Sequence, residues 1–121
     1  MNTITVTSAT AVTAKLCAAI RNGVDGETVD ATGGTLPTHG YWVGGRSWTL
    51  VKSASRVTPD DVAGFVSAHP TARYFGVWVE NGRAYLDIAD HVLSPRDAHA
   101  MAVERNEIAV FNIDTGECEH I

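Results

Sequence analysis

The dipeptide Asn81-Gly82 constrains the fold of this chain more than any other feature, because it separates two stretches with the composition of β-strands. Asn-Gly readily adopts the two positive φ angles of a type I′ turn, which joins neighbouring antiparallel strands through two residues. The flanking stretches, RYFGVWVE and RAYLDIA, are rich in aromatic and branched side chains. We therefore predict a β-hairpin centred on this turn.

A two-residue turn also fixes which side chains of the hairpin share a face, because successive residues of a strand point to opposite sides of the sheet. One face is apolar without exception, so we expect helices to pack against it. This face holds the cross-strand pairs Val79 with Ala84, Val77 with Leu86 and Phe75 with Ile88.

The other face of the hairpin mixes aromatic rings with charged groups, and we call it the aromatic face. It holds the pairs Glu80 with Arg83, Trp78 with Tyr85, Gly76 with Asp87, and Tyr74 with Ala89. Trp, Tyr and Arg are the residues enriched where proteins bind one another. The predicted binding residues are Trp78, Tyr85, Tyr74, Asp87 and Arg83, together with Trp42 and Trp48 from the preceding connection. In the alternative interpretation, that connection simply covers the rings as packing.

Three stretches carry the spacing and capping signals of helices. They are residues 9–21 after Ser8, a segment that starts with the capping-box pattern Thr58-Pro59-Asp60-Asp61 and ends at Pro70, and residues 95–105 after Ser94. Residues 24–46 contain six glycines and predict a long connection with at most a short strand or two. Further strands are predicted at residues 47–51, at 107–113, which are apolar on both faces and therefore expected to be central, and at 118–121.

These elements predict one α+β domain over residues 1–121, because a chain of this length with 45% hydrophobic residues can bury one core of ordinary size. From residue 47 to residue 113 the order is β-α-β-β-α-β, which is typical of the split, ferredoxin-like arrangement. The first helix and the last short strand are additions to that core. An antiparallel meander with the helices on one face would give the same linear order.

Composition narrows the classes of partner. A formal charge of -5 with nine scattered basic residues argues against a protein held mainly by phosphate contacts, so nucleic acid is an unlikely partner. Cys17 and Cys118 have neither the spacing of a zinc site nor that of a disulfide framework. The first residues lack the pattern of a signal peptide, and no apolar run approaches a membrane span. We therefore expect a cytoplasmic protein without a membrane partner.

The stretch DIADHVLSPRDAH crowds acidic residues and histidines into a short space, which raises the question of a metal or acid–base site. Asp97 follows Ser94 at a position where a carboxylate favours the start of a helix. Adjacent residues rarely point to one centre, so Asp90 and His91 make a poor ligand pair. A small-ligand, metal or hydrolytic site around Asp87, Asp90 and His91 is kept as an alternative, with no cofactor predicted.

The stretch YFGVWVENGRAYLDIADHVLSPRDAHAMAVERNEIAVFNIDTG, with GYWVGG and VTPDDVAGFV before it, resembles small accessory proteins of actinobacteria and actinobacteriophages. The resemblance covers about the C-terminal two-thirds of the chain and includes no catalytic motif. It implies a phage or mobile-element protein that acts by binding a host or defence protein.

No nucleophile elbow, zinc-protease motif or phosphate-binding loop occurs in the chain. The leading hypothesis is therefore a non-enzymatic module that binds a protein partner, or a second copy of itself, through the aromatic face. Besides the alternative site at Asp87, a further alternative is single-stranded nucleic acid, whose bases stack on exposed rings.

Overall fold

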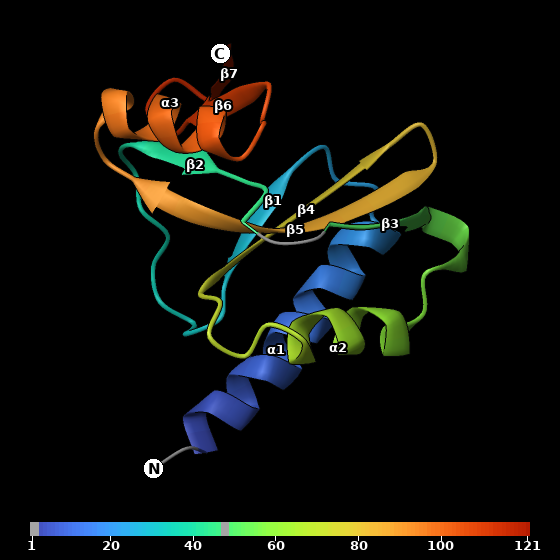
Figure 1. The fold of residues 1–121 in the computed structure, drawn as a ribbon. Helices are drawn as coiled ribbons and strands as arrows, with labels where there is room; N and C mark the ends of the chain where they lie inside the picture. The colour runs from blue at the N-terminus through green and yellow to red at the C-terminus, as the bar shows by residue number, and fades with distance from the viewer. Residues whose placement is uncertain (1–2, 47–48) are drawn as a thin grey trace.

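The computed structural model describes residues 3–46 and 49–121, with the backbone alone for residues 3–8. It is an α+β structure, as predicted, with a seven-stranded antiparallel sheet (Figure 1). Its elements in chain order are α1 (Thr3–Arg21), β1 (Glu27–Asp30), β2 (Tyr41–Val43), β3 (Leu50–Ser53), the short 3-10 helix η1 (Ala54–Arg56), α2 (Pro59–Ser67), β4 (Tyr74–Glu80), β5 (Arg83–Val92), α3 (Pro95–Glu104), β6 (Ala109–Asn112) and β7 (Glu117–His120).

The hairpin at the centre of the sheet is the one that the sequence predicts. Asn81 and Gly82 have φ angles of 52° and 75°, as a type I′ turn requires. Strands β4 and β5 pair from Glu80 with Arg83 down to Tyr74 with Ala89, so every predicted cross-strand pair is present. The hairpin therefore has one apolar face and one aromatic face, as expected.

The order of the strands is β1-β4-β5-β2-β6-β7, and β3 also pairs with β5. Strands β3 and β2 both pair with β5 at different points along its length: β3 pairs with residues 83–86 and β2 with residues 90–92. The glycine-rich connection thus supplies two short strands, β1 and β2, which is the most that its sequence predicted. All of the strand pairs are antiparallel.

The ferredoxin-like strand order is not confirmed. In that arrangement the first strand of the core lies beside the third, and the fourth lies beside the first. Strand β3 does pair with β5, but β6 pairs with β2 and β7 instead of β3. The reason is that β2 pairs with the end of β5 and β6 pairs with β2, so β6 lies away from β3.

The helices begin where their caps predict, except for the first. Helix α2 has the complete capping box of Thr58 and Asp61, and the Asp97 N–H of α3 donates to the Ser94 hydroxyl. Helix α1 starts at Thr3 instead of residue 9, so Ser8 lies inside the helix and not at its start. In the described part of the chain, none of the helices is both long and apolar enough to cross a bilayer.

The sheet carries two separate cores, which define two lobes. The large lobe contains α1, α2, β1, β3, β4 and residues 83–89 of β5, and its core includes Leu16, Phe65 and Phe75. The small lobe contains β2 and residues 90–121, and its core is Tyr41, Val43, Ala98, Ala102 and Val110. Figure 1 shows α1 and α2 against the β4–β5 hairpin and α3 beside β2 and β6, so each lobe has helices of its own.

Candidate functional site: the aromatic face

Trp78 and Tyr85 form the first part of the aromatic face, near the tip of the hairpin. Their rings stack in parallel, with centroids 4.9 Å apart and planes 3° from parallel. Both side chains are half-buried, and Val51 of β3, which lies opposite Tyr85, is 43% exposed. One surface of this stack therefore remains available to solvent, beside the exposed charged pair Glu80 and Arg83 at the hairpin end.

Trp42 and Tyr74 form the second part of the face, at the far end of the hairpin. Trp42 lies opposite His91 of β5, and its ring meets the Tyr74 ring edge-on at 4.8 Å and the His91 ring at 5.6 Å. The Arg73 guanidinium lies 5.1 Å from the centre of the Tyr74 ring. The structure thus places Trp42 with the predicted set. Trp48 lies outside the described residues.

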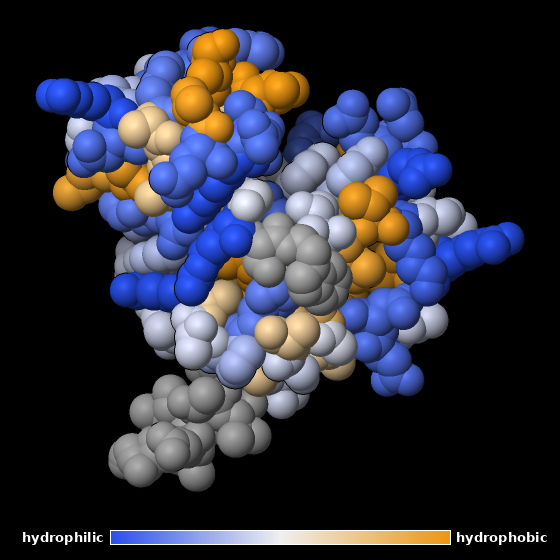
Figure 2. Space-filling view, in the orientation of Figure 1, coloured by the Kyte–Doolittle hydropathy of each residue, from blue (hydrophilic) through white to orange (hydrophobic). Residues whose placement is uncertain are grey.

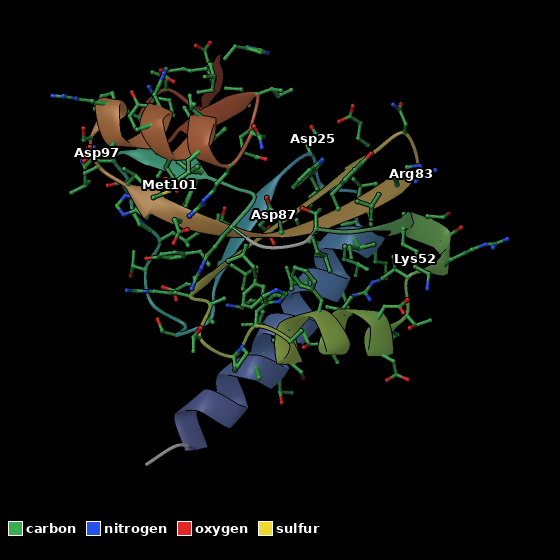
Figure 3. The ribbon with its side chains drawn as sticks, in the orientation of Figure 1. Asp25, Lys52, Arg83, Asp87, Asp97 and Met101 are labelled. Atoms are coloured by element: carbon green, nitrogen blue, oxygen red, sulfur yellow. The ribbon has the colours of Figure 1, made fainter. Side chains whose placement is uncertain are left out.

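Asp87 lies between these two aromatic groups along the hairpin, and its side chain is buried. Figure 3 shows Asp87 near the middle of β5. A Cβ on Gly76 or on Gly44 would collide with its carboxylate, so both positions need glycine. The sequence predicts the first of these contacts, because Gly76 lies opposite Asp87 in the hairpin. The second contact arises from the chain that follows β2.

Glu107 is a functional candidate that the sequence analysis missed. A Cβ on Gly45 would lie 2.7 Å from Glu107 Oε2, and one on Gly44 would lie 3.5 Å from Glu107 Oε1, so both carboxylates approach this glycine pair. Burial first, and then the nearby charge of Glu107, raise the pKa of Asp87 to about 6, against the lowering effect of the hydrogen bond from the Gly45 N–H. No local signal could have shown this, because Glu107 follows α3 and reaches Asp87 only through the fold.

The acidic crowd of the sequence is dispersed in the structure. Asp90 lies opposite Val43 of the small core, so it is on the other face of β5 from Asp87. Its Oδ2 accepts a hydrogen bond of 2.7 Å from Arg105 Nη2. His91 Nε2 lies 2.7 Å from the His39 carbonyl oxygen. Within residues 3–46 and 49–121, no three His, Cys, Asp or Glu side chains are grouped as a metal ion requires.

Comparisons with known proteins add no relative, because no family model, curated protein or solved structure matches the chain. Two arrangements thus stand out on this face of the sheet. One is the set of four partly exposed rings, and the other is the approach of Glu107 to the buried carboxyl group of Asp87. The rings are partly exposed at both ends of the hairpin, whereas Asp87 is only 8% exposed.

Proposed function

We propose that the protein is a non-enzymatic binding module whose aromatic face docks on a protein partner or on a second copy of the chain. One observation carries the proposal: four partly exposed rings lie on the face of the sheet opposite the large core, three of them on the hairpin and one on the adjoining β2. They are Trp78, Tyr85, Tyr74 and Trp42.

The large core does not need these rings. It is built on the opposite face of the hairpin, where Phe75, Val77 and Leu86 are each about 1% exposed. Half-buried tryptophan and tyrosine are costly to leave in water, since each ring can bury a large apolar area in a complex. The exposed charges of Glu80 and Arg83 beside them supply the polar rim that surrounds the centre of a binding surface.

The alternative at Asp87, Asp90 and His91 is less well supported by the geometry. The three side chains engage different partners, and the carboxylate of Asp87 is closed off by Gly76 and Gly44. Asp87 and Glu107 instead join the hairpin to the connection after β2 and to the end of α3. That arrangement favours a structural role for the carboxyl pair, at the junction of the two lobes.

The test compares the wild type with the double variant Trp78→Ala, Tyr85→Ala in light scattering and in affinity capture. Leu93→Ala is the control, because it removes an apolar side chain that is 70% exposed just after β5, at the end of the hairpin away from Trp78 and Tyr85. We expect the double variant to stay folded by circular dichroism and to lose an oligomer or a captured protein that the control keeps. A folded double variant that behaves as the wild type would contradict the proposal.

Because the chain resembles actinobacterial and phage proteins, the affinity capture uses a lysate of a high-GC host. Such a lysate contains the host and defence proteins that are the expected partners. Retention on single-stranded DNA or RNA provides the second arm. Binding there that weakens steeply with salt and disappears in the double variant would favour the nucleic-acid alternative over a protein partner.

A further inference from the structure

The net charge of the protein is confined to one lobe. Residues 90–121 contain seven Asp and Glu and two Arg, which amounts to -5, the formal charge of the whole chain. Residues 1–89 contain seven acidic and seven basic residues and are neutral overall. Ion pairs within the described residues engage only Asp90, Asp114 and Glu119 of the acidic groups in the small lobe. The small lobe therefore presents uncompensated negative charge to solvent.

The same lobe exposes an apolar patch, formed by Val103, Ile108 and Ile121, which are 59%, 78% and 47% exposed. Asn106, at a φ of 59°, reverses the chain between Val103 and Ile108, and the Ile121 N–H donates to the Ile108 carbonyl at 2.9 Å. The three side chains therefore gather where α3 ends, β6 begins and β7 ends. Figure 2 shows an orange group over this lobe with hydrophilic residues around it.

Beside the patch, β7 leaves one edge of its backbone without a strand partner in the described sheet, because it ends the strand order and pairs only with β6. The bond from Ile121 to Ile108 marks a hydrogen-bonded pair, and such pairs alternate along an antiparallel ladder. Glu119 and Glu117 therefore direct their backbone groups to β6. Cys118 and His120 direct theirs to the open edge, where a further strand can pair.

We propose that the open edge of β7 binds an extended segment of another protein that is both basic and apolar, because Glu117, Glu119 and the Val103–Ile108–Ile121 patch lie along it. A strand added to this edge would place every second side chain next to Glu117, Glu119 and Ile121 in turn. For a strand that runs parallel to β7, the matching pattern is basic, any residue, basic, any residue, apolar. This surface is separate from the aromatic face and does not depend on it.

Charge excludes the other occupants from this edge. An antiparallel pairing of β7 with a second copy sets Glu119 against Glu119 or Glu117 of that copy in the registers that use both outward-facing residues, and like charges directly opposite destabilise a strand pair. Nucleic acid and an anionic membrane surface have the same sign of charge as the lobe. The negative charge of the small lobe attracts a cationic segment. The Val103–Ile108–Ile121 patch then adds an apolar contact, which charge alone does not provide.

The first test is fluorescence anisotropy of a labelled peptide with the pattern Lys-Thr-Lys-Thr-Ile against the full chain. We expect binding that weakens with salt and that falls at least about tenfold in the double variant Ile108→Ser, Glu117→Lys. Val51→Ser is the control, since it removes an exposed strand side chain, 43% exposed, from the large lobe. The Val51→Ser variant should bind the peptide as the wild type does. The double variant Trp78→Ala, Tyr85→Ala should also bind it as the wild type does, so this test is distinct from that of the aromatic face.

A second readout is amide hydrogen exchange. The peptide should slow exchange at Cys118 and His120 and leave Glu119 unchanged, because only the first two N–H groups face the open edge. Equal binding of the peptide Lys-Thr-Lys-Thr-Ser would reduce the effect to diffuse charge and overturn the proposal. A dimer of the protein alone that Ile108→Ser dissociates would overturn it as well, by assigning the patch to a second copy.

Discussion

The large lobe packs fourteen buried apolar residues between two helices and the sheet, whereas the small lobe buries five beneath one helix. The large lobe is electrically neutral and keeps most of its large apolar side chains covered. The small lobe has the whole net charge of the protein and most of the large apolar residues that are exposed in the described chain. The comparison teaches that the buried apolar residues are concentrated in one lobe, whereas the exposed charge and the exposed large apolar residues are concentrated in the other.

Polar contacts hold the small lobe together and join it to the chain on either side of β2. Arg105 donates to the carbonyl oxygens of Val43 and Gly44 and to Asp90. Asp114 accepts from the Gly40 N–H and lies 2.6 Å from His39, which holds the pKa of that carboxyl below its usual range. Such contacts contribute modestly each, since they replace hydrogen bonds to water. We therefore expect the small lobe to open before the large lobe does.

A matched pair of valines gives the largest expected difference between the lobes. Val77 of β4 and Val110 of β6 are 1% and 2% exposed. We expect Val77→Ala to lower the free energy of unfolding by about 3 kcal/mol and Val110→Ala by about 1–2 kcal/mol, because the thinner small lobe can relax around the cavity. Urea denaturation measures both. Equal losses would remove the energetic contrast between the cores.

Gly76→Ala tests the junction between the lobes. The added methyl group would collide with the carboxylate of Asp87, so we expect a loss of about 1–3 kcal/mol. Adding Asp87→Ala to this variant should restore part of that stability by removing the carboxylate. A double variant that is less stable than the sum of the two single changes would show that the collision does not cause the loss.

Asp87 should make stability depend on pH at the same junction. Its pKa is about 6 in the folded protein against an ordinary value of 3.8, so the folded state holds the proton more tightly than the unfolded state. The contribution of Asp87 to stability is therefore present below about pH 4 and is lost as the pH rises through 6. Asp87→Asn should remove this dependence, worth about 1–2 kcal/mol between pH 4 and 7.

The difference between the unfolding curves of wild type and Asp87→Asn isolates this effect, because other carboxylates act in the opposite direction. Asp61 and Asp114 have lowered pKa values, owing first to Lys52 and to His39 respectively, so their contributions are lost on acidification. Parallel curves for the two proteins from pH 4 to 7 would contradict the role given to Asp87.

The smallest expected effect comes from Arg105→Met. The variant loses the hydrogen bonds to Val43, Gly44 and Asp90 but keeps most of the apolar stem, so we expect a loss of about 1 kcal/mol. Amide exchange should accelerate in α3 and β6 and stay unchanged in β4, where the large core decides stability. Uniform acceleration over both lobes would show that they unfold as one unit.

Local signals predicted the parts of the fold that they control. Asn81-Gly82 set the hairpin and its register, and Thr58 with Asp61 set the start of α2. The position of β6 could not be predicted, because it depends on β2, a three-residue strand with no periodicity of its own. A strand this short is defined by its partners on both sides.

The candidate site divides in the same way. Trp78, Tyr85 and Asp87 were predictable because a two-residue turn places them on one face. Trp42 was predicted only as a tryptophan in a nearby connection, and its contact with Tyr74 follows from the pairing of β2 with β5. Glu107 could not be predicted at all, since it approaches Asp87 only when both lobes are in place.

The central claim is that the aromatic face binds, and the unfolding free energy of Trp78→Ala, Tyr85→Ala, measured beside its association, tests it most directly. If the rings serve a partner, the double variant should lose no more than about 1–2 kcal/mol of stability and lose the association of the wild type altogether. A double variant that unfolds would show that the rings serve as internal packing and would contradict the claim. A double variant that keeps both its stability and its association would contradict it as well.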